Sequence, residues 1–169
     1  MESLQTKPVG QYLAEVHDQV KEMIIDQAFI DHRDSMKDKF RAAGRDDNTR
    51  LMHADCLAIE YNLLNKDLVS EPTSIFHDFI YEGAKVDCKI VTSKYFNVPD
   101  DKVTYYLKNI RSNQLSHFAF YKWDKHPDRP LQVGDTVSFK LCEVVDAERV
   151  LNKVEVSSYG GYYYRVKNI

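Results

Sequence analysis

Two aspartates and a lysine stand out in the middle of the chain because a β-hairpin would bring them together. Asp78 lies in the segment IFHDFIY, and Asp87 and Lys89 lie in the segment AKVDCKIVT. If Glu82 and Gly83 form the turn between two antiparallel strands, Asp78 faces Asp87 across the hairpin. Residues two apart on one strand point to the same face, so Lys89 is expected beside both aspartates.

Carboxylates that face each other across two strands repel, and a cation between them removes that cost. Mg²⁺ is suited to this position because it prefers hard oxygen ligands, binds few protein groups and keeps several waters. A lysine at the rim would position or deprotonate a water, or stabilise negative charge on a phosphate. The group therefore favours metal-assisted attack of water on a phosphodiester. The simpler alternative is a charged, solvated strand face, because D-x-K triplets occur often by chance.

The surrounding periodicity predicts one α/β (α+β) domain that comprises the whole chain, residues 1–169. Apolar residues at helical spacing predict helices, and short β-branched or aromatic runs predict strands. Residues 1–45 are interpreted as an N-terminal helical arm and residues 133–169 as C-terminal strands with a β-hairpin around Gly160 and Gly161. The predicted helices are 10–42, 50–66 and 101–115, and the predicted strands begin at 75 and 84 and cover 117–123 and 133–145.

The arrangement of residues 50–123 resembles the PD-(D/E)xK nuclease superfamily, which has the restriction endonuclease-like fold. The core of that fold is a helix, a three-stranded antiparallel meander, a second helix and a further strand. The resemblance implies a mixed central sheet flanked by helices. One meander strand is not obvious in the sequence, and it is expected near residues 68–71 or among the strands after residue 133.

By this resemblance, Asp78 and Asp87 would bind Mg²⁺, with Mn²⁺ as a substitute, and the backbone carbonyl of Cys88 would be a further ligand. Lys89 would serve the attacking water. Glu60, on the helix before the meander, would orient a water or bind a second metal. Cations near this site are expected to meet phosphates, although a solvated helix face is an equal alternative. These cations are Lys94, Lys108 and Arg111.

We therefore expect a Mg²⁺-dependent endonuclease that hydrolyses DNA. The Gln-x-x-x-Tyr pattern of several exonuclease branches is missing, which disfavours an exonuclease. Two alternatives stay open: a non-catalytic nucleic-acid-binding module on the same fold, and a structural or interaction protein. The sequence also leaves open RNA as the substrate, and duplex, branched or single-stranded forms.

Composition sets the broad class of the protein. The chain has 169 residues, of which 43% are hydrophobic and 29% charged, as in a globular domain. The formal net charge is −3, but residues 101–169 carry 11 basic and 8 acidic side chains. A polyanion is therefore expected to meet mainly the C-terminal part. A domain of this size is expected to act on two strands as a homodimer or larger symmetric assembly, and would suit a phage or mobile element.

The cysteines and the absence of long apolar runs indicate the compartment. Three cysteines occur at wide spacing without a CxxC pair, which disfavours a disulfide framework and a zinc site. We expect buried thiols in a reducing, cytoplasmic setting. No basic segment followed by an apolar stretch opens the chain, and no apolar run is long enough to span a membrane, so neither a secretory signal nor a membrane partner is expected.

Overall fold

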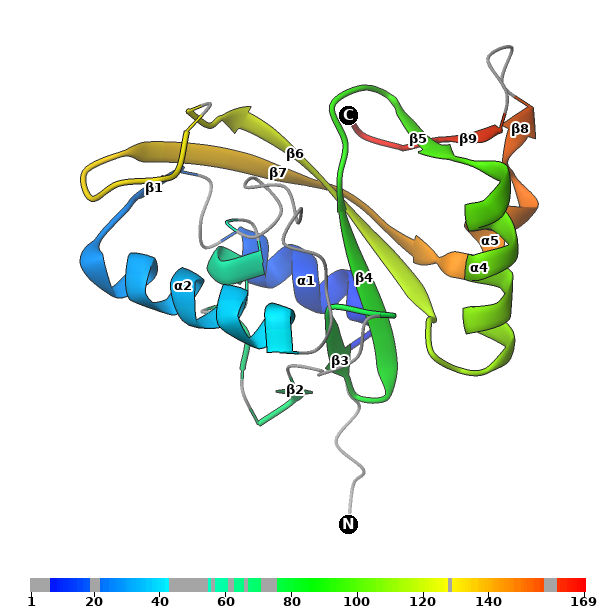
Figure 1. Ribbon diagram of the computed structural model, residues 1–169, viewed down its shortest axis with the longest axis horizontal. Coiled ribbons are helices and arrows are strands. Elements are labelled where there is room, and N and C mark those ends of the chain that lie inside the picture. Colours follow the sequence, from blue (N-terminus) through cyan, green and yellow to red (C-terminus); the bar gives the residue numbers. More distant parts are fainter. Residues whose placement is uncertain are drawn as a thin grey trace.

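The computed structural model describes residues 7–18, 22–42, 55, 57–60, 63–65, 67–70, 76–127, 129–156 and 161–169. Within these residues the protein is mixed α+β, with a curled six-stranded sheet, a smaller three-stranded sheet and flanking helices (Figure 1). The helices are α1 (Val9–His17), α2 (Gln27–Ala42), α4 (Asp100–Arg111) and α5 (Ala147–Asn152). No described helix is long and apolar enough to cross a membrane.

The large sheet has the strand order β1-β7-β6-β4-β3-β2. Neighbouring strands are antiparallel except β4 and β6, which are parallel and are joined through α4. A parallel pair needs a long crossover, and α4 supplies it. The strands are β1 (Glu22–Ile24), β2 (Val69–Ser70), β3 (Phe79–Tyr81), β4 (Ala84–Ile90), β6 (His117–Lys125) and β7 (Thr136–Asp146).

The small sheet pairs the C-terminal hairpin with a strand from the middle of the chain. Its order is β5-β9-β8, in which β5 is Tyr95–Val98, β8 is Glu155–Val156 and β9 is Tyr162–Arg165. The pairing of β8 with β9 confirms the predicted hairpin. The partner strand β5 was not predicted, because the sequence near Asn97 and Pro99 indicated only a break before the next helix.

Alternation along β4 and β6 separates two hydrophobic clusters. Val86, Cys88 and Tyr121 belong to the cluster under α1 and α2, whereas Phe118 and Phe120 belong to the cluster under α4 and α5. Successive residues of one strand point to opposite faces of the sheet, so neighbouring residues of β6 are buried against different pairs of helices. In Figure 1, α1 and α2 lie beneath the curve of β6 and β7, and α4 and α5 lie at the other end of the molecule.

The predicted helical arm over residues 10–42 is not a single helix. The chain forms α1, then β1, then α2, and β1 pairs with the edge of β7. The apolar run Met23-Ile24-Ile25 interrupts the helical pattern because β-branched residues favour strands. Leu13 is fully buried and Phe29 is 1% exposed, so this segment is part of the core rather than a projecting arm.

The remaining predicted elements lie close to their expected positions. The helix predicted at 101–115 is α4, which begins after Pro99 with acidic residues in its first turn and ends with cations in its last. That charge order complements the helix dipole. Of the helix predicted at 50–66, residues 55, 57–60 and 63 are described and are helical. Cys88 and Cys142 are buried thiols as predicted, and Cys56 lies outside the described residues.

Candidate active site

The turn at Glu82 and Gly83 sets the register of the β3–β4 hairpin. Both residues have positive φ values, 46° and 84°, which is the backbone of a tight two-residue turn of type I′. Tyr81 then pairs with Ala84 and Phe79 pairs with Val86. This is the predicted register from Phe79 to Tyr81. The pairing ends there, because the N–H of Asp78 meets the carbonyl of Val86, so Asp78 lies at the end of the ladder and not directly opposite Asp87 as predicted.

Asp78 lies immediately before β3, where its backbone and side chain both bind β4. Its N–H donates to the carbonyl of Val86 at 2.8 Å, and its Oδ2 accepts the N–H of Cys88 at 2.7 Å. The carboxylate thus replaces the backbone acceptor that a longer β3 would have offered. Asp78 is only 4% exposed, so these bonds hold its carboxylate against β4.

The backbone of Cys88 presents its carbonyl to the same side of β4. The N–H and C=O of one strand residue point to the same neighbouring strand, and those of the next residue point to the other. Because the N–H of Cys88 meets Asp78, its carbonyl is also directed to the β3 side, beyond the first residue of β3. The thiol itself is fully buried in the core.

Asp87 and Lys89 form an ion pair along β4. Nζ of Lys89 lies 3.2 Å from Oδ2 of Asp87, and the two side chains are 30% and 10% exposed. Burial acts to lower the pKa of Lys89, but the Asp87 carboxylate, Tyr106 and the Asp78 carboxylate outweigh it and raise that pKa. Lys89 is therefore a cation that interacts with both carboxylates, and the sequence predicted that it would lie beside them.

Tyr106 on α4 covers the lysine. The Nζ atom of Lys89 lies 5.7 Å from the centre of the Tyr106 ring, and Tyr106 is 6% exposed. Burial is the main reason that the pKa of Tyr106 is raised, so the phenol stays neutral. Nothing in the sequence signalled a contact between Tyr106 and Lys89.

Glu60 lies elsewhere, paired with His17 of α1. Oε1 of Glu60 lies 3.1 Å from Nδ1 of His17, and Nε2 of His17 accepts the N–H of Leu141 at 3.2 Å. Since Nε2 accepts, Nδ1 carries the proton and donates it to Glu60. Glu60 is 1% exposed, and burial raises its pKa. The structure therefore brings Asp78, Asp87 and Lys89 together but leaves Glu60 with His17.

The donor set fits a cation that takes few protein ligands. Among the residues that the structure describes, no group of three or more His, Cys, Asp or Glu side chains is arranged to hold a metal ion. Two nearby carboxylates and one backbone carbonyl are nevertheless a suitable set for Mg²⁺, which usually combines one or two carboxylates with waters and substrate phosphates.

The cations expected to contact phosphates are exposed, and two of them lie away from the lysine. Lys108 and Arg111 are on α4, where positions two and five residues beyond Tyr106 lie roughly on the opposite side of the helix. Lys94 is exposed just before β5. Lys102 lies one turn before Tyr106 on the same side, with its Nζ 4.6 Å from the ring centre of Tyr105. Sequence reasoning missed Lys102 as a cation near the site.

Comparisons of the chain with protein-family models, with curated proteins and with solved structures gave no match.

Proposed function

We propose that the protein is a metal-dependent endonuclease that hydrolyses phosphodiester bonds of DNA at the site formed by Asp78, Asp87 and Lys89. The observation that carries this proposal is the ion pair of Lys89 with Asp87, 3.2 Å apart, beside the buried Asp78, whose carboxylate accepts the N–H of the intervening Cys88. A purely structural role predicts that the aspartates lie apart or that Lys89 points away. The hairpin register and the ion pair argue against that alternative.

The chain order around the site supports a restriction endonuclease-like core. Helical residues 57–60 precede the antiparallel strands β2, β3 and β4, and α4 then leads to β6, which lies parallel to β4. The resemblance to the PD-(D/E)xK superfamily implies this order. In this proposal the short β2 would serve as the meander strand that the sequence suggested near residues 68–71.

In the proposed mechanism, Asp78, Asp87 and the carbonyl of Cys88 would hold the Mg²⁺, with Mn²⁺ as a substitute. When bound, the metal would supply polarisation of the phosphate and activation of water. Lys89 would position the attacking water or donate hydrogen bonds to the phosphate oxygens. Glu60 has no part in this proposal.

Cleavage of both strands of a duplex would require two such sites. A symmetric homodimer is the simplest arrangement that provides them, because one operation relates both sites and both strands. We therefore include a dimer in the proposal. The molecular mass of the protein in solution, measured with and without DNA, tests whether this dimer forms.

Plasmid cleavage with Mg²⁺ or Mn²⁺ tests the proposal. Wild-type protein is compared with the variants Asp87→Ala and Lys89→Ala, and with Lys140→Ala, which removes an exposed lysine from β7. We expect nicking or linearisation that Lys140→Ala retains, and that both site variants and a chelator abolish. Cleavage that survives both site substitutions would show that the activity belongs to another site or another protein.

The non-catalytic nucleic-acid-binding module remains a second candidate because the carboxylates already have partners within the chain. Asp87 contacts Lys89, and Asp78 accepts the N–H of Cys88. In such a module both side chains would only stabilise the fold through these bonds, and neither would bind a metal. This candidate predicts DNA binding by folded protein without cleavage and without any rise in melting temperature when Mg²⁺ is added.

A further inference from the structure

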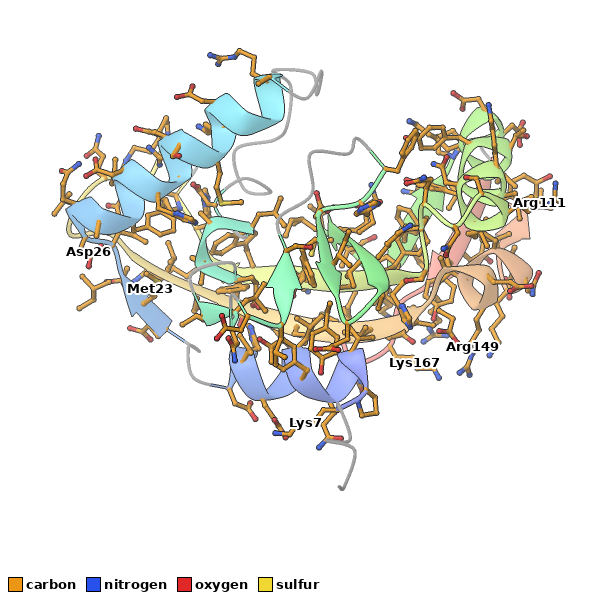
Figure 2. All side chains as sticks on the ribbon, turned by 90° about the horizontal axis from the view of Figure 1, so that it is seen from below. Lys7, Met23, Asp26, Arg111, Arg149 and Lys167 are labelled. Carbon is orange, nitrogen blue, oxygen red and sulfur yellow. The ribbon has the colours of Figure 1, made fainter. Side chains whose placement is uncertain are left out.

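Four exposed cations gather at the end of the molecule formed by α5 and β9. We call them the basic surface: Arg149, Lys153, Arg165 and Lys167. A hollow of about 600 Å³ is lined in part by Arg149 and Lys153, and one of about 320 Å³ by Lys153, Arg165 and Lys167. Because Lys153 lines both, the hollows are neighbours. Figure 2 labels Arg149 and Lys167 at this end of the molecule and Lys7 beside α1.

These cations are available to an external anion. None of the four forms an ion pair with another residue in the described part of the chain. Three acids also line the hollows: Asp146, Glu148 and Glu155. Glu148 is exposed, and the other two are hydrogen-bonded. Glu155 accepts the hydroxyl of Tyr163 at 2.5 Å, and Asp146 lies 2.9 Å from Nε2 of His117.

The spacing of the basic surface suits a chain of phosphates better than a single one. Arg149 and Lys153 are four residues apart, which corresponds to a rise of about 6 Å along a helix. Arg165 is the last residue of β9, and Lys167 follows it two residues later in a turn. The smaller hollow also contains Tyr163, and an aromatic ring beside cations can stack on a base or pack on a sugar.

We propose that the basic surface binds the phosphodiester backbone of a nucleic acid at a place separate from Asp87 and Lys89. It would hold the nucleic acid through its phosphates and leave the chemistry to the hairpin site. The choice of nucleic acid as the polyanion rests on the proposed function. The C-terminal part also carries the chain's excess of basic residues, since residues 101–169 have 11 basic and 8 acidic side chains.

Fluorescence anisotropy with labelled single-stranded and duplex oligonucleotides tests this inference. The full chain is used with a chelator, so that no cleavage occurs. We expect Lys153→Glu/Arg165→Glu to weaken binding about tenfold or more at moderate salt, and to lower the slope of log K against log salt by about two. The neutral variant Lys153→Gln/Arg165→Gln should show a smaller loss of the same kind.

The matched control is Lys125→Glu/Lys140→Glu, which makes the same change in net charge at two exposed lysines on β6 and β7. It should retain most of the affinity, and circular dichroism should show that all variants are folded. Equal weakening by both charge-reversal pairs, no weakening by the basic-surface pair, or no binding by wild-type protein would overturn the inference. Binding to anionic lipid vesicles in place of the oligonucleotides would also overturn it.

The failure of this inference differs from the failure of the proposed function. Anisotropy in chelator measures only the basic surface, and plasmid cleavage by Asp87→Ala and Lys89→Ala measures only the hairpin site. Binding that depends on Lys153 and Arg165 without any metal-dependent cleavage would support the surface and refute the nuclease. Metal-dependent cleavage that does not depend on Lys153 and Arg165 would support the nuclease and refute the basic surface as a binding site.

Discussion

Lys89 and Asp87 are paired along a single strand, with Nζ of the lysine 3.2 Å from Oδ2 of the aspartate. The pair lies beneath Tyr106, and Asp78 is held beside it by the bond from the N–H of Cys88; Tyr106 and Asp78 are both nearly buried. The ammonium of Lys89 is close to both carboxylates and neutralises part of their repulsion. The same lysine can therefore stabilise the fold and serve the proposed chemistry.

Replacing Lys89 by methionine should separate these two roles. Without the ammonium, the two carboxylates repel each other at a mostly buried position, and we expect a loss of about 2 kcal/mol in the free energy of unfolding. Mg²⁺ should recover part of this loss, while plasmid cleavage should fall at least about a hundredfold. Urea unfolding with and without Mg²⁺ measures the first effect. A variant that unfolds like wild type and gains nothing from Mg²⁺ would contradict the proposed metal site.

The β3–β4 turn should respond to substitutions that fit or oppose its backbone. Glu82 has a φ of 46° and Gly83 a φ of 84°, and Asn-Gly is the preferred pair for such a turn. We expect Glu82→Asn to stabilise the protein by about 0.5 kcal/mol and Gly83→Ala to destabilise it by about 1 kcal/mol. Thermal unfolding measures both changes, and both variants should keep the register and hence cleave DNA. A stabilising Gly83→Ala would contradict the turn assignment.

The hairpin could be predicted from the sequence because its information is local. A Glu-Gly pair between two runs of alternating β-branched and aromatic residues fixes both the turn and the register. That register predicted that Asp78 would face Asp87 and that Lys89 would lie beside Asp87. The structure confirms the register from Phe79 to Tyr81 and the position of Lys89, but Asp78 leaves the register because its N–H bonds to the carbonyl of Val86.

The contacts of α1, β1 and Glu60 could not be predicted, because they depend on packing between distant segments. Apolar residues at helical spacing over 10–42 predicted one helix, and the short apolar run at 23–25 is identified as a strand only by its pairing with the edge of β7. Likewise, Glu60 shares a helix face with apolar residues, and the partner that explains it, His17, is 43 residues away. Periodicity shows that a residue is buried, but it does not identify the residue it meets.

Glu60 should matter for stability and not for cleavage. In Glu60→Gln the amide oxygen still accepts the Nδ1 proton of His17, so we expect a change below about 1 kcal/mol and full cleavage. In Glu60→Ala the buried His17 loses its acceptor and a cavity opens, which should cost about 2–4 kcal/mol. Chemical denaturation and plasmid cleavage measure the two effects. Loss of cleavage in a stable Glu60→Gln variant would return Glu60 to the catalytic site.

A second buried charge cluster should dominate the stability of the α2 end of the molecule. Asp55 is fully buried, with Oδ2 2.9 Å from Nε2 of His126 and Oδ1 3.6 Å from NH1 of Arg33. Burial raises the pKa of Asp55, although His126 and Arg33 oppose this. Asp55→Ala would leave two buried nitrogen groups without this carboxylate, and we expect a loss of about 3–5 kcal/mol.

The only tryptophan of the chain, Trp123, reports this change directly, because its ring centre lies 4.6 Å from that of His126. Fluorescence during urea unfolding therefore follows the cluster itself. Asp124→Ala, an exposed acid on β6, serves as the control and should change stability by less than about 0.5 kcal/mol. Similar losses of stability in Asp55→Ala and Asp124→Ala would show that the buried cluster contributes no more to stability than an exposed acid.

Asp135 should make the loop between β6 and β7 sensitive to acid. Both oxygens of Asp135 contact Arg129 at 2.8 Å, and Oδ2 also accepts the N–H of Gln132. Arg129 is the main reason that the pKa of Asp135 is lowered from 3.8 to about 2. A carboxyl whose pKa is lower in the folded state stabilises that state at pH values above its unfolded pKa, and this stabilisation is lost as the pH falls through the folded pKa.

The melting temperature of wild type should therefore exceed that of Asp135→Asn by a constant amount above about pH 5, and the difference should vanish between about pH 4 and pH 2. Differential scanning calorimetry across this range measures it, with Asp124→Asn as a control that removes an exposed carboxylate from β6. A difference that persists unchanged at pH 2 would mean that the charge of Asp135 does not hold the loop.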